Sequence, residues 1–462
     1  MDISSMGMPS VTATATIPGV LTPPEYWQNF HQCGHFCHSW VRGGAIRLNL
    51  VIRTEVSQRV RLPRPMAFGL AATVIGFCLA ASAVPSPIYK LYASTWRLDT
   101  STVTLIYATY CFGALASLLV LGRVSDAVGR RPVIAAGLAG LTASMVLFAF
   151  ASGVGSLFLA RAVQGLSTGI VISAAGAALL ELYDGADPAR AGLYNVVASS
   201  LGVGSGGLLG AVLVQYGPSP MVTPFVLLAV LAALLLAGSV LMPETVVSRS
   251  GFRITAPGVP RAALAPFTLA GLAIACAWSI IGLFLGLVGA IVPSLLHTGS
   301  YLPAGVAILV MGGAGTAAAI STRKRTPASQ IGWGMAIMSA GILVLAVSVT
   351  GSGSAAAFLC SGVVIGFGMG SGMFGALRLL GAAAPPDHRA QVMAAFYLVA
   401  YAAISLPAIA AGYTARHLGA APTIQLFGAG IVVVSLATLA LARRRARSDT
   451  RSAGRSFVAS SK

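Results

Sequence analysis

Residues 122–133 read GRVSDAVGRRPV, a polar stretch that lies between two long apolar runs. Gly122 and Gly129 permit a tight turn, because glycine adopts backbone conformations that other residues avoid. Pro132 suits the first turn of the helix that follows, where its missing N–H has no partner to lose. The stretch therefore predicts a sharp connection between two antiparallel helices.

The charges of this stretch are its second feature. Asp126 is its only acid and lies among Arg123, Arg130 and Arg131. The carboxylate can pair with these arginines, or it can approach the N-terminus of another helix, where a negative charge gains about 0.3–1 kcal/mol. An ordinary positively charged loop is the alternative, but the spacing Gly-x3-Asp-x2-Gly-Arg-Arg is unusual for one. We therefore expect these residues to have a specific role.

The composition around this stretch excludes a soluble enzyme. Of the 462 residues, 56% are hydrophobic and only 9% are charged, whereas a soluble domain carries roughly 25% charged residues. About 20 apolar residues span a bilayer as a helix, because in lipid the backbone must satisfy its own hydrogen bonds. The sequence thus predicts an all-α integral membrane fold with twelve transmembrane helices. Their expected positions are 66–88, 101–121, 132–152, 155–180, 191–214, 222–242, 267–294, 302–321, 330–349, 355–380, 390–414 and 421–442.

The longest interior polar stretch, 243–266, divides these helices into two sets of six. We expect it to be a cytoplasmic linker between an N-terminal bundle at 66–242 and a C-terminal bundle at 267–443. A polar leader at 1–65 precedes the bundles, and we expect it to be disordered and cytoplasmic. A basic cytoplasmic tail at 444–462 follows them.

Similar sequence features recur in the two halves at an offset of about 200 residues. Gly165 and Gly169 correspond to Gly366 and Gly370, and each half has a short Asp- and Arg-containing loop before its fifth helix. Together these matches favour a duplication. Two pseudo-symmetric six-helix bundles with a site between them are the architecture of a transporter.

The net charge of +18 is explained by orientation in the membrane. Cytoplasmic loops carry an excess of Lys and Arg. With both termini in the cytoplasm, all of the 29 Lys and Arg residues lie on the inner side except four: Lys90, Arg97 and Arg416 on the outer side, and Arg161 inside a helix. The charge is thus a topology signal and a contact for anionic lipid, and we expect no nucleic-acid partner. The chain is expected to be a multi-pass protein of the inner or plasma membrane.

Metal and disulfide chemistry are not expected. The leader contains HQCGHFCH at 31–38, which has the ligand types for a soft metal but matches no zinc spacing closely. The six cysteines are scattered and form no disulfide framework.

The fourth helix contains LARAVQGLSTG at 159–169, in which Arg161, Gln164 and Gly165 lie on one face. A charge at the centre of a membrane costs about 2.5–3.5 kcal/mol on insertion scales, so such residues usually face a cavity. The alternative is that Arg161 reaches the membrane surface with its long side chain.

Glycines in the fifth helix form GVGSGG at 202–207. Small residues let helices approach closely, so Gly202, Gly206 and Gly207 are expected to pack against neighbouring helices. In the first helix, Pro85 and Pro87 are expected to bend or end it. Tyr89 and Tyr92 would then lie at the outer interface.

No predicted helix has a carboxylate at its centre. A cavity without a central acid is expected to prefer neutral, amphiphilic or anionic compounds. Aromatic side chains that could line it, or could instead be ordinary packing residues, are Tyr107, Tyr110, Trp278, Tyr397 and Tyr401.

With these motifs, the chain resembles the major facilitator superfamily over about residues 66–443. The loop motif is the most specific part of the resemblance, and Val124 replaces its usual Leu. The matching residues are Gly122, Asp126, Gly129, Arg130 and Arg131.

The resemblance implies secondary transport by alternating access. In this superfamily the Asp and Arg residues of the loop latch the two halves together on the inner side. Carried over, Asp126 would face the start of the eleventh helix near Arg389. Arg161, Gln164 and Gly165 match the fourth-helix motif of proton-linked members.

The fifth helix resembles the antiporter motif Gly-Pro-x-x-Gly-Gly, but Val203 replaces the Pro. We expect proton-coupled efflux of small amphiphilic compounds by a monomer, with the proton gradient as energy source and no cofactor. Coupling would use Arg161 and Gln164 with Asp126, Glu181 or Asp99. Proton-coupled uptake of a small metabolite, and a non-transporting receptor or scaffold, are the alternatives.

Overall fold

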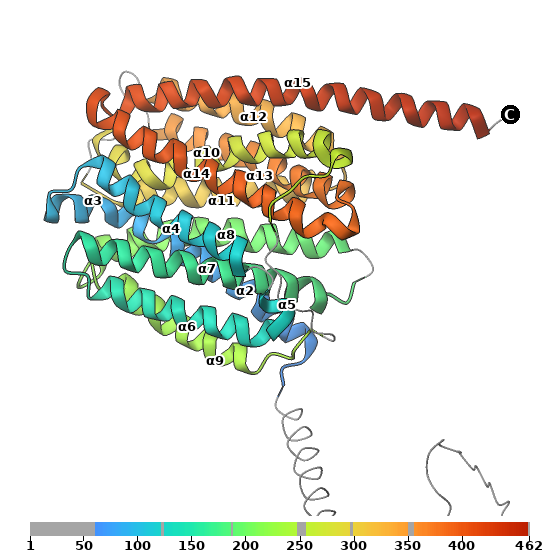
Figure 1. Cartoon of the computed structure of the whole chain (residues 1–462). Helices are drawn as coiled ribbons and strands as arrows, with labels where there is room; N and C mark the ends of the chain where they lie inside the picture. Colours follow the sequence, from blue (N-terminus) through green and yellow to red (C-terminus); the bar gives the residue numbers. More distant parts are fainter. Residues whose placement is uncertain are drawn as a thin grey trace, which may run out of the picture. The chain divides into compact units, whose positions relative to one another are not determined.

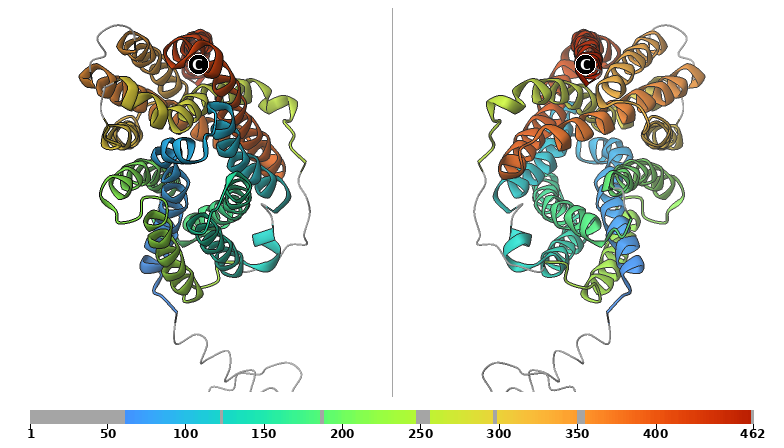
Figure 2. Two further views of the ribbon diagram at one scale, coloured as in Figure 1. Left: turned by 90° about the vertical axis from the view of Figure 1, so that its left-hand side faces the viewer. Right: turned by 90° about the vertical axis from the view of Figure 1, so that its right-hand side faces the viewer.

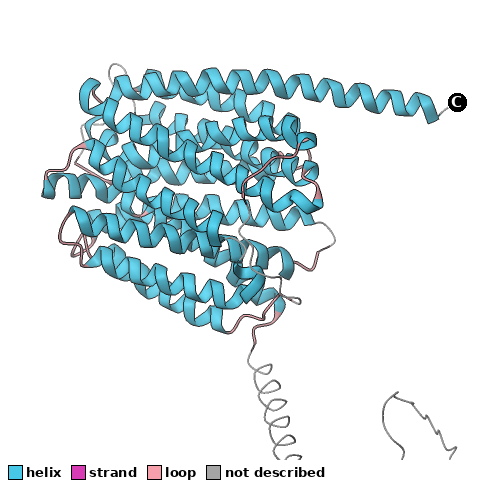
Figure 3. Ribbon diagram, in the orientation of Figure 1, coloured by secondary structure: helices cyan, strands magenta, loops and turns pink. Residues whose placement is uncertain are grey.

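In the computed structural model, which describes residues 61–121, 124–185, 188–246, 256–295, 299–349 and 355–460, every element of regular structure is a helix (Figure 3). Twelve spans among these residues are long and apolar enough to cross a membrane. The predicted all-α fold and the predicted number of spans are therefore confirmed. Most of the expected leader, with its HQCGHFCH segment, lies outside the described residues, as does Gly122.

The first half of the described chain runs from α2 to α9 (Figure 1). Its helices are α2 (Arg64–Ala83), α3 (Pro85–Trp96), α4 (Thr100–Leu121), α5 (Val124–Val128), α6 (Arg130–Ala149), α7 (Val154–Leu182), α8 (Pro188–Tyr216) and α9 (Thr223–Val240).

The second half begins with a short 3-10 turn, η1 (Arg261–Ala263), and a second such turn, η2 (Pro386–His388), precedes α14. Its helices are α10 (Leu264–Leu295), α11 (Leu302–Ser321), α12 (Pro327–Ser348), α13 (Ala355–Ala383), α14 (Arg389–Leu418) and α15 (Ala420–Ser460).

The first span consists of α2 and α3, joined at Val84, whose backbone is also helical. Pro85 and Pro87 stand in the first turn of α3, where a missing N–H is tolerated. The prediction that this span ends at residue 88, with Tyr89 and Tyr92 at the membrane interface, was wrong. The helix continues for two further turns, and these tyrosines are only 3% and 1% exposed.

The helices form two groups, which Figure 2 shows as a blue-to-green set and a yellow-to-red set. Within the first group, α7 packs against α4 and α6, and α2 packs against α8. Within the second group, α13 packs against α11 and α12, and α10 packs against α14. The groups meet where α8 lies against α11, α14 against α4, and α3 against α10.

Glycines at equivalent places hold equivalent helix pairs together. A Cβ on any of four glycines would overlap the backbone of the neighbouring helix, so only glycine permits the observed approach. In the first half the pairs are Gly165 with Tyr110 and Gly169 with Ala114, and in the second half they are Gly366 with Met311 and Gly370 with Gly315. The same packing of α7 on α4 and of α13 on α11 is what a duplicated sequence produces.

A proline inside α14 leaves a backbone carbonyl without its helical partner. Pro407 has no N–H to donate to the carbonyl of Ala403, four residues earlier. The hydroxyl of Ser279 on α10 donates to that carbonyl instead, at 3.0 Å. In a membrane, where no water replaces a lost bond, such a donor from a neighbouring helix lets the proline remain in the span.

The last helix is longer than its membrane span. Its apolar span ends at Ala446, but α15 continues to Ser460 and extends past the ends of its neighbours (Figure 1). The basic tail predicted at 444–462 is therefore helical over most of its length.

Candidate functional site: a central cavity and two polar clusters

The connecting loops define two ends of the bundle. We call the end with residues 124–131 and 243–246 the linker end. The end with Asp99 and Arg416 is the far end. The linker end lies just after the last turn of α4, and the far end lies just before the first turn of α4. The two ends are therefore separated by the length of a membrane span.

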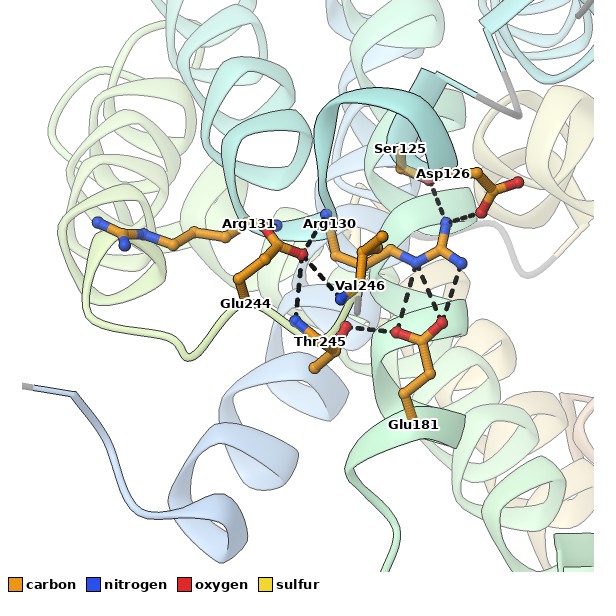
Figure 4. A network of polar contacts seen from close by, with 8 residues as sticks. All are labelled: Ser125, Asp126, Arg130, Arg131, Glu181, Glu244, Thr245 and Val246. Carbon is orange, nitrogen blue, oxygen red and sulfur yellow. Dashed lines mark hydrogen bonds and ion pairs between the residues drawn. The ribbon is translucent and has the colours of Figure 1, made fainter. Parts of the chain in front are cut away.

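Arg130 is the centre of a polar cluster at the linker end (Figure 4). Its guanidinium forms an ion pair with Asp126 and donates to the Ser125 hydroxyl at 2.6 Å. The same guanidinium pairs with Glu181 at the end of α7, with a distance of 2.9 Å from Nη2 to Oε1. Arg130 therefore ties the loop motif to the last turn of α7.

Glu244, just after α9, caps the start of α6 (Figure 4). Its carboxylate accepts the backbone N–H groups of Arg130 at 2.8 Å and Arg131 at 3.2 Å. These N–H groups have no partner within the helix, and the helix dipole favours a negative charge there. The carboxylate also accepts the N–H groups of Thr245 and Val246. The start of the linker between the two halves is thus fastened to the loop motif.

Gly129 makes this cap possible. Its φ of +120° lies in a region that other residues rarely adopt, and a Cβ there would overlap the carboxylate of Glu244. The side chain of Arg131 points away from the cluster (Figure 4). Arg389 is exposed in the first turn of α14, and its expected proximity to Asp126 stays a prediction.

Arg161 on α7 is fully buried inside the first half. It donates to the Tyr89 hydroxyl at 2.8 Å, to the Ser82 carbonyl at 3.3 Å and to the Gln164 amide oxygen at 2.6 Å. Three rings also surround its charge, with 5.3 to 5.5 Å from the guanidinium carbon to the centroids of Tyr89, Tyr110 and Phe148. The alternative that it reaches the membrane surface is therefore excluded.

No carboxylate among the described residues forms an ion pair with Arg161. Its charge is held by dipoles and aromatic faces, and Gln164 is itself fixed by donating to the Ala81 carbonyl at 2.9 Å. A buried charge is costly unless its hydrogen bonds are satisfied. The pair Arg161 and Gln164 is thus held against the last turn of α2.

A cavity of about 100 Å³ lies at the middle of the bundle, between the two halves. Side chains from α2, α4 and α8 line it on one side, and side chains from α10, α11, α13 and α14 line it on the other. It includes four of the five predicted aromatic residues: Tyr107, Tyr110, Trp278 and Tyr401.

Tyr397, the fifth predicted aromatic residue, lies elsewhere. It is partly buried and packs edge-on against Phe396, with 5.8 Å between ring centroids. The structure does not place it among the residues that line the cavity.

The predicted glycines of the fifth helix lie where α8 closely approaches its neighbours. A Cβ on any of them would overlap the adjacent helix. Gly202 meets Gly76 and Gly206 meets Ala80 on α2, and Gly207 meets Ile308 on α11 across the interface between the halves.

At the far end, polar contacts join the two halves. Asp99 accepts a 2.8 Å hydrogen bond from Arg416, which also forms an ion pair with it. The Tyr301 N–H donates to the side chain of Gln215 at 3.1 Å, and the Lys90 ammonium lies 5.6 Å from the centre of the Tyr301 ring. These contacts join the two halves at the far end in this conformation.

Sequence reasoning missed three of these residues. Tyr89 was expected at the membrane surface, but it holds Arg161. Glu244 and Arg416 were counted only as loop charges, because their partners lie more than 100 positions away in sequence. Glu244 follows directly after Pro243 at the end of a span, which is a weak signal for a helix-end contact.

Among the described residues, no group of three or more His, Cys, Asp or Glu side chains could hold a metal ion. The arrangement provides a cavity shared by two similar halves, with charged and polar contacts at each end of the bundle.

Comparisons with known proteins agree with this architecture. The family model described as Major Facilitator Superfamily matches residues 66–406. The tetracycline resistance protein, class C, of Escherichia coli is 35% identical over 148 residues, which are 30% of this chain and 35% of that protein. The puromycin resistance protein of Streptomyces alboniger is 39% identical over 121 residues, or 26% of this chain and 24% of that protein. The matched stretches thus span about a third or less of these curated relatives.

A solved structure shares the fold. The crystal structure of the human organic anion transporter MFSD10 (TETRAN) superimposes with a TM-score of 0.62 at 15% identity, covering 82% of this chain and 100% of that one. At this identity the likeness shows the fold alone. Because the family model matches residues 66–406, well over half of the chain, the chain belongs to the Major Facilitator Superfamily, whose members are transporters rather than enzymes, and it is a multi-pass membrane protein.

Proposed function

We propose that this transporter exports small amphiphilic compounds from the cytoplasm of a cell, driven by the proton gradient. The observation that carries the proposal is the central cavity, which is lined from both halves, together with the contacts that join the halves at the far end. Such a cavity is exposed to one side at a time when two bundles rock about their interface. The resistance functions named for the relatives support export.

The orientation in this proposal places the linker end in the cytoplasm and the far end outside. Its support is the distribution of Lys and Arg, which is strongly biased to the loops of the linker end and to the tails. In that orientation, the contacts that join the halves at the far end would hold the outer side shut while a compound enters from the cytoplasm. We place the protein in the plasma membrane, where a proton gradient is available.

Coupling to protons is proposed to use α7. This helix carries Arg161 and Gln164 near the cavity and Glu181 at the linker end. Twenty residues separate Arg161 from Glu181, roughly 30 Å at 1.5 Å per residue. Breaking the pair between Glu181 and Arg130 would free α7 to move relative to the loop motif. A shift of the rigid helix would then carry Arg161 past the α2 carbonyls that hold it.

The test is an export and susceptibility panel in a host that lacks its own pumps. Asp126→Asn and Arg161→Ala are expected to insert normally, as judged by membrane abundance, and to lose export. Undiminished export by both variants would refute the assigned roles.

A proton-coupled uptake permease is the second candidate, because the same cavity could serve import. Transport into inverted vesicles, with and without an imposed proton gradient, separates the two. Accumulation that requires an acidic lumen supports export by exchange for protons. A receptor or scaffold would bind compounds in the same vesicles without any flux.

A further inference from the structure

The central cavity combines three features that together select its ligand. Where the structure describes it, the cavity has no charged residue in its lining, a buried hydrogen-bond donor without a partner, and a positive charge behind its wall. From these we propose that the cavity binds uncharged, largely apolar molecules that present a hydrogen-bond acceptor to Trp278, and that it excludes organic cations. This rests on the proposed function only in taking the cavity as the transport site.

The lining is uncharged wherever the structure describes it. Three serines and three tyrosines supply its polar groups, and the rest of the wall is aliphatic, aromatic or thioether. An ion that entered would lose its water without gaining a counter-charge, which is strongly unfavourable in an apolar site. An uncharged molecule meets no such barrier.

Trp278 offers a buried donor without a partner. Its indole Nε1 is buried and has no hydrogen-bond partner among the described residues. The ring is held edge-on by Tyr401, with 5.0 Å between centroids, so the donor has a defined direction. A buried N–H without a partner is unfavourable, and a ligand carbonyl, ether or sulfonyl oxygen that accepted from it would remove that penalty.

Arg161 lies directly behind the wall. Its guanidinium donates to the carbonyl of Ser82 and lies 5.5 Å from the ring centroid of Tyr110, and both of these residues line the cavity. No carboxylate pairs with it among the described residues. In a medium of low dielectric its charge reaches into the cavity and repels a cation.

The cavity is small in this conformation, and its wall can adapt. Ligand pockets commonly have about 300–1,000 Å³, whereas this cavity has about 100 Å³. Three methionines of the second half line it, Met311, Met369 and Met373. Methionine is flexible and polarisable, so these side chains can move apart for ligands of different shapes.

The experiment measures equilibrium binding to the purified full chain in nanodiscs with three probes that share one fluorophore. Dansylamide is neutral, dansylcholine is a cation and dansylglycine is an anion. We expect dansylamide to bind most tightly, with dansylcholine at least tenfold weaker and dansylglycine between them. Leu79→Trp, which fills the cavity, supplies the background from probe in lipid. Equal or tighter binding of either charged probe would overturn the proposal.

The donor is tested by Trp278→Phe, which keeps an aromatic ring and removes the N–H. We expect dansylamide to bind about three- to tenfold more weakly. N-phenyl-1-naphthylamine, which has no strong acceptor, should bind as it does to the wild type. Trp333→Phe is the matched control, since Trp333 is 57% exposed and far from the cavity lining. If both probes lost affinity equally, Trp278 would act only by packing, and its role as a hydrogen-bond donor to the ligand would be refuted.

A variant that gains affinity for a cation tests whether charge sets the selectivity, and its result cannot be explained by misfolding. Met373→Glu places a carboxylate in the wall, and Met373→Gln is its uncharged match. Only the Glu variant should raise the affinity of dansylcholine relative to dansylamide. If neither or both do so, charge does not set the selectivity. Binding in this order without any export would support the inference and refute the proposed function. Export of cations would support the proposed function and refute the inference.

Discussion

The carboxylate of Asp99 has two roles in one place: it caps α4 and it joins the two halves. One oxygen accepts the backbone N–H of Thr102 at 2.8 Å, and the other accepts from Arg416 of α14 at 2.8 Å. The first bond is local, and the second connects residues 317 positions apart. Opening of the far end must break the second bond and can leave the first intact.

Loss of this ion pair should favour opening of the far end. Asp99→Asn keeps a good helix cap and Arg416→Gln leaves the cap untouched, so both remove only the contact between the halves. An exposed pair contributes about 0–1 kcal/mol, so the open fraction should rise by up to about fivefold. Pulsed electron-spin distances between labels at Ser94→Cys and Leu418→Cys, in a background from which the six native cysteines are removed, report the change. If the two variants differ from each other, the cap and not the pair is responsible.

The pH dependence of this contact follows from the lowered pKa of Asp99. Hydrogen bonds from Thr102 and Ser101, with the charge of Arg416, hold the pKa at about 2. The stabilisation is therefore complete above the ordinary pKa of an aspartate and is lost only as the pH falls toward 2. The same spin-label distances should stay constant from pH 5 to 9 in the wild type. A transition near pH 6 that Asp99→Asn abolishes would contradict this assignment.

The cap of α6 by Glu244 should stabilise the first half. Glu244→Ala removes an acceptor from the first turn of α6, and we expect a loss of about 1–2 kcal/mol in the free energy of unfolding. Thermal unfolding in detergent measures it. Asp184→Ala is the control, because Asp184 forms only an exposed pair with Arg64.

Gly129 and Glu244 should be coupled. Gly129→Ala introduces both a strained φ and an overlap with the carboxylate of Glu244. Gly419 also has a positive φ but has open space around it, so Gly419→Ala measures strain alone. We expect Gly129→Ala to lower the unfolding midpoint further than Gly419→Ala does. In a Glu244→Ala background the two glycine substitutions should lower the midpoint equally. Equal effects at both glycines would show that the overlap is relieved without cost.

Tyr89 should be required to hold Arg161. Tyr89→Phe removes the hydroxyl that accepts from the guanidinium and leaves a buried charge short of a partner, with an expected loss of about 1.5–3 kcal/mol. Tyr92→Phe is the matched control, since its buried hydroxyl has no partner among the described residues. Thermal unfolding and export should both fall in the first variant and stay near the wild type in the second. Similar losses in both would mean that packing, not the hydrogen bond, matters here.

Ser279 should matter only because of Pro407. Ser279→Ala leaves the Ala403 carbonyl without a donor, and a bond between membrane helices is worth about 0.6 kcal/mol on average and up to about 1.7. In a Pro407→Ala background the helix regains its own N–H, so the Ser279→Ala effect should disappear. The double-mutant cycle is measured by unfolding the wild type, the two single variants and the double variant in a denaturing detergent. Additive losses would show that the hydroxyl has another role.

Much of the candidate site could be predicted from local patterns. The turn at Gly129, the charges around Arg130 and the buried position of Arg161 each follow from residues within a few positions of one another. Four of the five aromatic residues named as candidates line the cavity, although the sequence left open whether each was an ordinary packing residue. Tyr89 could not be found this way, because its nearby prolines suggested a helix end. Only the tertiary structure shows that its hydroxyl lies 2.8 Å from Nε of Arg161.

The sequence by itself determined that this chain has twelve apolar helices in two similar halves. Hydrophobic runs and loop charges are local properties, and they decide insertion into the bilayer without reference to tertiary contacts. Only the tertiary structure decided that Asp99 meets Arg416, that Glu244 meets the start of α6, and that the cavity wall is free of charge. Those facts depend on which face of each helix meets which neighbour, and a run of uniformly apolar residues does not mark the face that turns inward.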